Sequence, residues 1–321
     1  MRTSADGSDG AALFSVLAAE GADAASQGAG LAAGWAAVAA ERTGVATKRA
    51  DVAVAGAETA AEGAGAAVRG AGLTAVGAGA EMVVALAGFL SLLQLIDSAF
   101  PTGAFAHSFG LETAIQEGRV HSGGELFAWL ASYTRGSLTP FDAVGVYFAH
   151  RYALEAAAVG ADWEGGPLID LDRRLTVARL ARESREGSIK IAKRYLHMAL
   201  ELHPESGLDR YAGWIREGTC FGSVPLIHGW MSAYLGQTPR MAMLTHLYAA
   251  VNSLLQVALR AMAIGQTEGH KVMQALLPLL ANESERILGC PPDPQDMFCD
   301  AFVQEIAAMR HETLYSRLFM S

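Results

Sequence analysis

The sequence predicts an all-α fold, with a single helical-bundle domain of about ten helices behind a low-complexity extension. From Phe89 onward, apolar residues recur at helical spacing, and Gly and Pro residues separate the apolar runs. No series of alternating apolar and polar residues indicates strands in this part of the chain. With 321 residues, 51% of them hydrophobic, the chain has enough apolar side chains for one substantial core.

Residues 1–81 differ in composition from the rest, because roughly half of them are Ala or Gly and few are large and apolar. Each Gly costs about 1 kcal/mol in a helix interior, and little apolar surface is present to offset the ordering entropy. We therefore expect a disordered or frayed extension over 1–81 and a helical domain over 82–321. A dispensable extension, or a start assigned ahead of Met82, is favoured over a functional arm.

The first helix of the predicted domain, Phe89–Ile96, ends before a turn in which Pro101 and Gly103 interrupt the helical pattern. Two aromatic residues and a histidine follow within five residues: Phe105, His107 and Phe109. We interpret this stretch as a corner that presents these side chains to a neighbouring helix or subunit. For His107, a hydrogen-bonded packing role is favoured over a role as metal ligand or base.

The helices predicted next, in chain order, span Gly110–Glu117, Gly124–Ser137, Phe141–Val159, Leu171–Glu201, Leu208–Glu217, Pro225–Leu235, Pro239–Ile264, Glu268–Leu280 and Asp296–Leu318. The clearest is Pro239–Ile264, whose broad apolar stripe at i, i+3, i+4 spacing is typical of a central helix. Gly265 then predicts a stop, and Thr267 a cap for the next helix.

Charge and cysteine content exclude several classes of function. The net charge of −9 argues against a nucleic-acid partner, which would need clustered Lys and Arg. Three cysteines without a CxxC pair indicate neither a disulfide framework nor a zinc site, so we expect a reducing, cytoplasmic location. The apolar segment Met82–Ile96 is too short to span a membrane, and we interpret it as a buried helix.

Catalytic and metal-binding signatures are missing. The sequence has no GxxxxGK[ST], GxGxxG, GxSxG or HExxH motif, and its nine histidines form no HxxxH or HxH pair. We therefore predict a protein that is not an enzyme and holds no metal or cofactor. A helical enzyme with an acid–base pocket around His107 stays open as the alternative. A peripheral membrane protein acting through Met82–Ile96 is a third, less favoured, interpretation.

Two charged regions are candidates for partner binding. The predicted helix Leu171–Glu201 concentrates basic residues, and i, i+3, i+4 spacing would place several on one face. Its candidate residues are Arg179, Arg182, Glu183 and Arg185. Both a solvated face with weak ion pairs and a docking surface remain open.

The second region is the C-terminal tail, where an apolar helix runs into an aromatic and arginine-rich end. Such an end either packs on its own domain or is captured by another protein, and the Tyr and Arg content favours capture. The candidate contact residues are Arg310, His311, Glu312, Tyr315, Ser316, Arg317, Leu318 and Phe319.

From Phe89 to Ser321 the chain resembles the family of the urease accessory protein UreF. Five blocks carry the resemblance in order: LLQLIDSAFPTGAFAHSFGLE, RLTVARLARESREGSIKIAKR, GSVPLIHGW, AIGQTEGHKVMQALLPLL and MRHETLYSRLF. Ala104 stands where the family commonly has Gly or Ser. The resemblance does not cover the N-terminal block to Ala80.

The resemblance implies a non-catalytic, homodimeric, all-α scaffold in nickel insertion. It implies a complex with UreD (also called UreH), the GTPase UreG and apo-urease, in which the partners handle nickel and GTP. On this resemblance, the tail 310–319 is the UreD-type contact, ordered on binding. The stretch from Pro101 through Phe105 to His107 and the arginine-rich helix are candidates for the dimer or GTPase-facing surface.

Overall fold

Helices make up all the regular structure of residues 73–321, the part of the chain that the structure, a computed structural model, describes. They are α3 (Leu73–Ile96), α4 (Leu111–Gln116), α5 (Gly123–Tyr133), α6 (Val144–Val159), α7 (Gly166–Val177), α8 (Arg182–Leu202), α9 (Leu208–Arg216), α10 (Val224–Tyr234), α11 (Pro239–Ala261), α12 (Gln266–Gly289) and α13 (Phe302–His311). The described residues contain no strand, which confirms the predicted fold class. The disorder predicted for 1–81 concerns residues outside this range, except that α3 already begins at Leu73.

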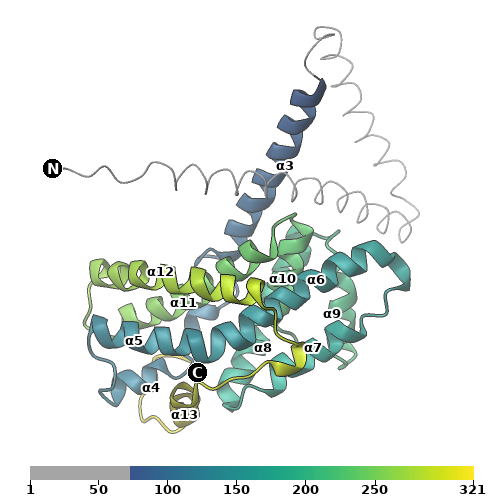
Figure 1. Cartoon of the computed structure of the whole chain (residues 1–321). Helices are drawn as coiled ribbons and strands as arrows, with labels where there is room; N and C mark the ends of the chain where they lie inside the picture. The colour runs from purple at the N-terminus through teal and green to yellow at the C-terminus, as the bar shows by residue number, and fades with distance from the viewer. Residues whose placement is uncertain (1–72) are drawn as a thin grey trace, which may run out of the picture.

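The helices pack around a core formed by α6, α10 and α11, with α12 and α5 lying alongside α11 (Figure 1). The backbones of α6 and α10 come close enough that a Cβ atom on Gly229 would lie 2.3 Å from the carbonyl oxygen of Val146. The surrounding helices bury one side of α11, including Leu247 and Val251, which are fully inaccessible. The prediction of a central helix that begins at Pro239 is confirmed, but α11 ends at Ala261 instead of Ile264.

Helix α11 is also the one described helix that is long and apolar enough to cross a membrane, but 56% of the apolar window lies inside the domain. The same length and composition suit the core helix of a helical bundle, which is the position that α11 occupies.

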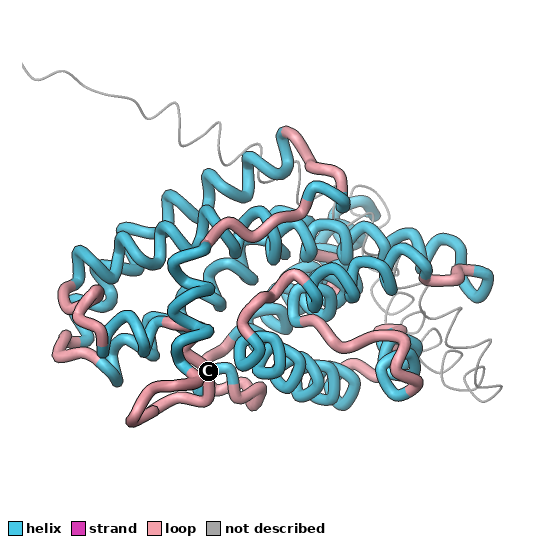
Figure 2. The backbone as a smooth tube through the Cα atoms, turned by 90° about the horizontal axis from the view of Figure 1, so that it is seen from below, coloured by secondary structure: helices cyan, strands magenta, loops and turns pink. Residues whose placement is uncertain are grey.

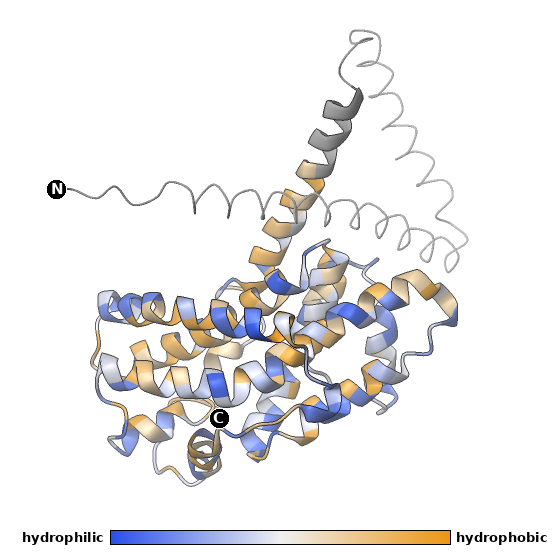
Figure 3. Ribbon diagram, viewed as in Figure 1, coloured by the Kyte–Doolittle hydropathy of each residue, from blue (hydrophilic) through white to orange (hydrophobic). Residues whose placement is uncertain are grey.

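Helix α3 leaves the domain at an angle (Figure 1), and the part of it nearest the domain is coloured mostly as hydrophobic in Figure 3. Near its C-terminal end, Leu92 and Leu95 are buried. Toward the other end, Val83, Val84 and Leu86 are more than half exposed. The prediction of a buried helix over Met82–Ile96 is therefore right for the base of α3 and wrong for its outer part, which extends beyond the helices that could cover it.

Helices α5 and α6 are joined without a loop. A π-helical segment, Thr134–Ala143, connects them and contains Pro140, where two separate helices, Gly124–Ser137 and Phe141–Val159, were predicted. Proline lacks a backbone N–H and normally breaks an α-helix, but the wider π geometry accommodates the ring. The hydroxyl of Thr134 donates to the carbonyl oxygen of Leu130, 2.8 Å away, at the start of this segment.

The helix predicted over Leu171–Glu201 is wrong, because the chain breaks between α7 and α8. At the break, the backbone N–H of Ala181 donates to a carboxylate oxygen of Glu305, 3.1 Å away. The Arg185 guanidinium donates to the carbonyl oxygen of Arg179 at 2.7 Å. Side chains thus satisfy the backbone groups that a continuous helix would have paired.

The bounds of the last two predicted helices, Glu268–Leu280 and Asp296–Leu318, are also wrong. The helix predicted over Asp296–Leu318 is only α13, because the chain after His311 lies in turns and loop (Figure 2). Helix α12 begins at Gln266 with Gly265 as its cap, instead of Thr267, and continues to Gly289 through Pro278. The predicted helices Gly110–Glu117, Leu208–Glu217 and Pro225–Leu235 are confirmed to within two residues at each end.

Candidate functional site

The structure brings the three predicted regions together, because the C-terminal tail lies across both the front corner and α8. We call residues 312–321 the tail and residues 101–109 the front corner. The main-chain oxygen of Ser321 accepts a hydrogen bond from the hydroxyl of Ser108 at 2.6 Å and from the backbone N–H of Phe109 at 3.1 Å. Segments more than 200 residues apart in sequence therefore form one site.

His107 is buried within this contact. Its Nδ1 lies 2.8 Å from the hydroxyl of Ser321, and the ring sits against Gly187 of α8, where a Cβ atom would lie 2.6 Å from Nδ1. Burial chiefly, and then the positive charges of Lys190, Arg194 and His311, lower the pKa of His107 to about 4. The predicted packing role is confirmed.

Among the residues that the structure describes, no carboxylate contacts the ring of His107. An acid–base pair needs such a partner within hydrogen-bond reach, so this geometry gives the alternative of a pocket around His107 no support.

The exposed part of the front corner is Pro101 and Phe105. Phe105 is 58% exposed, and the Arg260 guanidinium lies 5.8 Å from its ring centroid. The same guanidinium lies 4.7 Å from the ring of Phe319, which is buried. Arg260 of α11 thus links the front corner to the tail.

The arginine-rich region does not present one shared face. Arg179 precedes α8 and points into the domain, where it pairs with the buried Asp142 at 2.5 Å. Burial raises the pKa of Asp142, and the Arg179 charge acts against that rise. Arg182 is exposed on α8 and pairs with Glu312 of the tail at 2.9 Å. The break between α7 and α8 is what separates the two arginines.

Residues 310–321, which are the end of α13 and the tail, divide into buried and exposed sets. His311 at the end of α13 is fully buried between Glu112 and Glu183, and Phe319 is 5% exposed. The carboxylate of Glu183 also accepts from Arg317 at 2.8 Å. Tyr315 and Leu318 are exposed. Of the two options that the sequence left open, the structure shows the tail packed on its own domain, with part of its surface still free for a partner.

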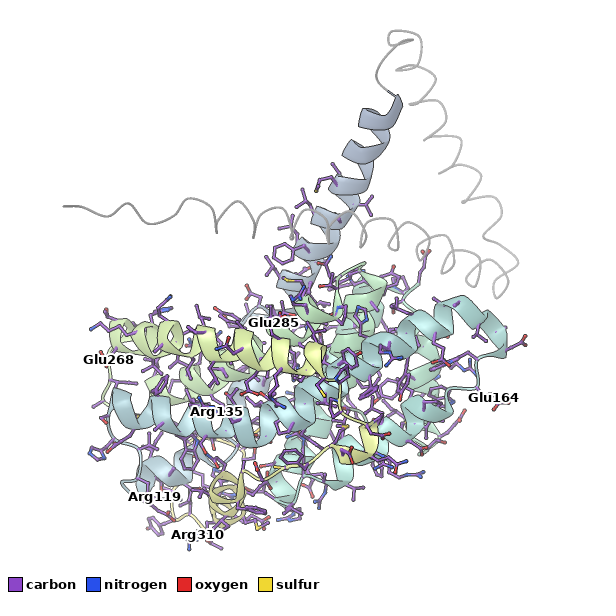
Figure 4. All side chains as sticks on the ribbon, viewed as in Figure 1. Arg119, Arg135, Glu164, Glu268, Glu285 and Arg310 are labelled. Carbon is purple, nitrogen blue, oxygen red and sulfur yellow. The ribbon has the colours of Figure 1, made fainter. Side chains whose placement is uncertain are left out.

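Figure 4 places Arg119 and Arg310 at the same end of the molecule. Both guanidinium groups pair with the carboxylate of Glu117, at 2.7 and 3.3 Å respectively. The main-chain oxygen of Ser316 accepts from the Gln116 amide at 2.9 Å. The C-terminal end of α4 therefore contacts both α13 and the tail.

A cavity of about 200 Å³ lies behind the front corner. Its wall is mostly apolar, and its polar members include Tyr133, Asp142, Arg179, Tyr195, His228 and His246. Burial lowers the pKa of His228 and of His246 to about 3, so both rings are neutral near pH 7. With Asp142 paired to Arg179, the cavity offers an apolar volume with neutral imidazoles.

Sequence reasoning missed buried carboxylates that hold loops in place, and two of them accept several hydrogen bonds each. One is Glu112, which fastens the tail. The other is Asp172, which accepts from the backbone N–H groups of Phe221 at 2.7 Å and Gly222 at 3.1 Å, and from the hydroxyl of Tyr211. Asp172 lies on the apolar stripe of α7 formed by Leu168 and Leu175, and this placement is the signal that could have found it.

The sequence predicts no metal site, because its histidines are not at ligand spacing. Within residues 73–321, no group of three or more His, Cys, Asp or Glu side chains is arranged to hold a metal ion.

Comparisons with known proteins agree with the resemblance. A family model described as UreF matches residues 120–277. The urease accessory protein UreF of Arthrobacter sp. is 35% identical over 232 residues, which are 72% of this chain and 96% of that protein. The UreF of Lachnoclostridium phytofermentans is 35% identical over 72% of this chain and 98% of its own length. The UreF of Ureaplasma urealyticum is 31% identical over 234 residues.

Proposed function

Because the chain belongs to the urease accessory protein UreF family, we propose that it is a non-catalytic scaffold that bridges a UreD-type (UreH) protein and the GTPase UreG. In this proposal the scaffold acts in the cytoplasm as a homodimer, and it couples GTP hydrolysis to the insertion of nickel into apo-urease. The partners hold the nickel and the nucleotide, and this chain holds no cofactor of its own.

The observation that carries the proposal, beyond family membership, is the exposed apolar side of α13. Phe302, Ile306 and Met309 follow one another at i, i+4 and i+7 and are 61%, 47% and 42% exposed. Two exposed residues next to these along the chain, Phe298 and Val303, extend this surface. Contiguous exposed apolar surface of this kind marks protein–protein contacts in soluble proteins. We call these five residues the α13 surface.

The α13 surface continues into the exposed side chains of the tail. Tyr315 is wholly exposed and Leu318 is 64% exposed. Arg310, at the end of α13, has an exposed side chain as well. Aromatic, aliphatic and arginine side chains together are typical of the residues that dominate binding energy at interfaces. We therefore propose the α13 surface and the tail as the UreD-type contact.

The test is co-purification of this chain with its UreD homologue. Deletion of residues 310–321 would be a poor probe, because His311 and Phe319 are buried and their loss would disturb α4 and α8. The double variant Tyr315→Ala/Leu318→Ala removes only exposed side chains. We expect it to lose most of the bound UreD homologue, whereas Tyr248→Ala, at an exposed tyrosine on α11, keeps it. Undiminished binding by the double variant would reject this contact.

For the dimer or the GTPase-facing surface we propose the front corner and the start of α8. The exposed candidates there are Pro101, Phe105 and Arg182, and the half-buried Glu183 and Arg185 support them. Replacement Phe105→Ala is expected to change the mass of the assembly in solution, or to weaken UreG retention in a co-purification. If neither the mass nor the retention changes, the front corner is not an interaction surface.

A further inference from the structure

The tail is fastened through a histidine held between two carboxylates. His311 is fully buried at the C-terminal end of α13. Its Nδ1 lies 2.7 Å from a carboxylate oxygen of Glu183 on α8, and its Nε2 lies 3.0 Å from a carboxylate oxygen of Glu112 on α4. One imidazole ring therefore bridges two helices that are far apart in the sequence.

The same two carboxylates bind the tail directly. Glu112 accepts hydrogen bonds from the backbone N–H of Leu318 at 2.6 Å and of Phe319 at 3.0 Å. Glu183 accepts from the Arg317 guanidinium at 2.8 Å. The His311 ring and the tail therefore share the same two carboxylate groups as partners.

This geometry specifies how many protons the ring carries. An ionised carboxylate only accepts hydrogen bonds, so each ring nitrogen that faces one must carry a hydrogen. A neutral imidazole has a single N–H, and its other nitrogen would point a lone pair at a carboxylate oxygen. Only the imidazolium form of His311 satisfies Glu112 and Glu183 together.

Charged and titratable groups reach His311 from several elements. They are Glu112 on α4, Glu183 on α8, His107 in the front corner, and Arg317 with the Arg182–Glu312 pair at the tail. His107 is neutral near pH 7, because its pKa is lowered to about 4. Guanidinium groups in general keep their charge across the usable pH range. Of the side-chain types gathered here, imidazole is the one whose ordinary charge change falls between about pH 5 and 8.

We propose that protonation of His311 is a latch for the tail: the imidazolium holds residues 312–321 on α4 and α8, and loss of its proton as the pH rises releases them. This latch concerns the chain by itself and does not depend on the scaffold role. In the released state the neutral ring donates a hydrogen bond to only one of the two carboxylates, Glu112 or Glu183. The backbone N–H groups of Leu318 and Phe319 then exchange with water.

Hydrogen–deuterium exchange of the full chain tests the latch. After correction for intrinsic rates, we expect the protection of the Leu318 and Phe319 amides to fall roughly tenfold or more between about pH 6 and about pH 9, as expected for lost charge-assisted hydrogen bonds. Amides of α11 should change little over the same range. Equal tail protection at both pH values would overturn the proposal.

Two variants separate the latch from general effects of pH. The variant His311→Gln carries no titrating proton, so we expect weak tail protection that does not vary with pH. The matched control is His270→Gln on the exposed side of α12, which should behave like the unmodified chain. A tail that keeps its pH dependence in His311→Gln would contradict the latch.

A measurement without any substitution covers the case in which His311→Gln fails to fold. The ¹⁵N chemical shifts of the His311 ring distinguish the imidazolium from the neutral ring. We expect imidazolium shifts at about pH 6 and their loss in step with the rise in tail exchange. A neutral ring at a pH where the tail is fully protected would overturn the proposal.

Discussion

Glu112 is a buried carboxylate on α4 whose two oxygens each accept two hydrogen bonds. One oxygen accepts from Leu318 N and Gln116 Nε2, and the other from Phe319 N and His311 Nε2. A carboxylate is well suited to this position, because it accepts on both oxygens and donates nothing. The side chain therefore decides, at the scale of one residue, where the tail lies.

Replacement Glu112→Gln should destabilise the domain by about 1–3 kcal/mol, because the new amide N–H₂ faces N–H donors and leaves them unsatisfied. Urea unfolding followed by circular dichroism measures this loss. The control is Glu117→Gln on the exposed end of the same helix, whose ion pairs with Arg119 and Arg310 are worth at most about 1 kcal/mol. Equal losses in the two variants would show that Glu112 does not fasten the tail.

Residue roles were only partly predictable from the sequence. The packing role of His107 follows from an imidazole placed between aromatic residues without a second ligand. Glu112 gave no such signal, because its partners Leu318 and Phe319 lie 206 and 207 residues away along the chain. A short-range pattern cannot show a contact that only the fold creates.

At the scale of elements, α6 and α10 approach each other closely. This approach occurs at Gly229, where an added Cβ atom would lie 2.3 Å from the carbonyl oxygen of Val146 and 2.9 Å from the Cβ of Ala149. One of these neighbours is backbone, which can give way only if a helix moves.

Replacement Gly229→Ala should cost about 1–3 kcal/mol, since overpacking outweighs the roughly 1 kcal/mol by which Ala favours a helix over Gly. Thermal unfolding measures the change. Gly124→Ala in α5 is the matched control, because its Cβ would meet nothing within 4 Å, and it should be neutral or slightly stabilising. A stabilised Gly229→Ala variant would mean that α6 and α10 are not in this close contact.

Most helices could be predicted, since the apolar period and the Gly and Pro residues determine them locally. The break between α7 and α8 could not, because 178–181 contain neither Gly nor Pro. There, Glu305 of α13 receives the Ala181 N–H from a distant part of the chain. The helix predicted over Asp296–Leu318 is too long for a similar reason. Glu112, far away in the sequence, accepts the backbone N–H groups of Leu318 and Phe319, which therefore do not pair within a helix.

At the scale of the whole molecule, the domain buries several neutral histidines. Burial is the largest cause of a lowered pKa in His107 and His150, each to about 4, and in His228 and His246, each to about 3. His228, for example, lies between the hydroxyls of Tyr195 and Thr245 at 3.0 and 2.9 Å.

These histidines predict loss of stability in mild acid. Because their pKa values are lower in the folded state, the unfolded chain takes up protons first as the pH falls below the ordinary value of about 6.5. The stability they contribute is thus complete above that pH and declines toward pH 4, by at most about 1.4 kcal/mol per histidine and pH unit. Melting temperatures at about pH 7 and pH 5.5 measure this decline. An unchanged or higher melting temperature at the lower pH would contradict it.

The central claim, that this chain is a scaffold for urease maturation, is tested most directly by urease activity in cells that lack its gene. We predict that such cells make urease protein with little activity, and that the unmodified chain or the Tyr248→Ala variant restores it. The Tyr315→Ala/Leu318→Ala variant should restore little, because both exposed tail side chains are missing. Full urease activity in the absence of the gene would contradict the claim.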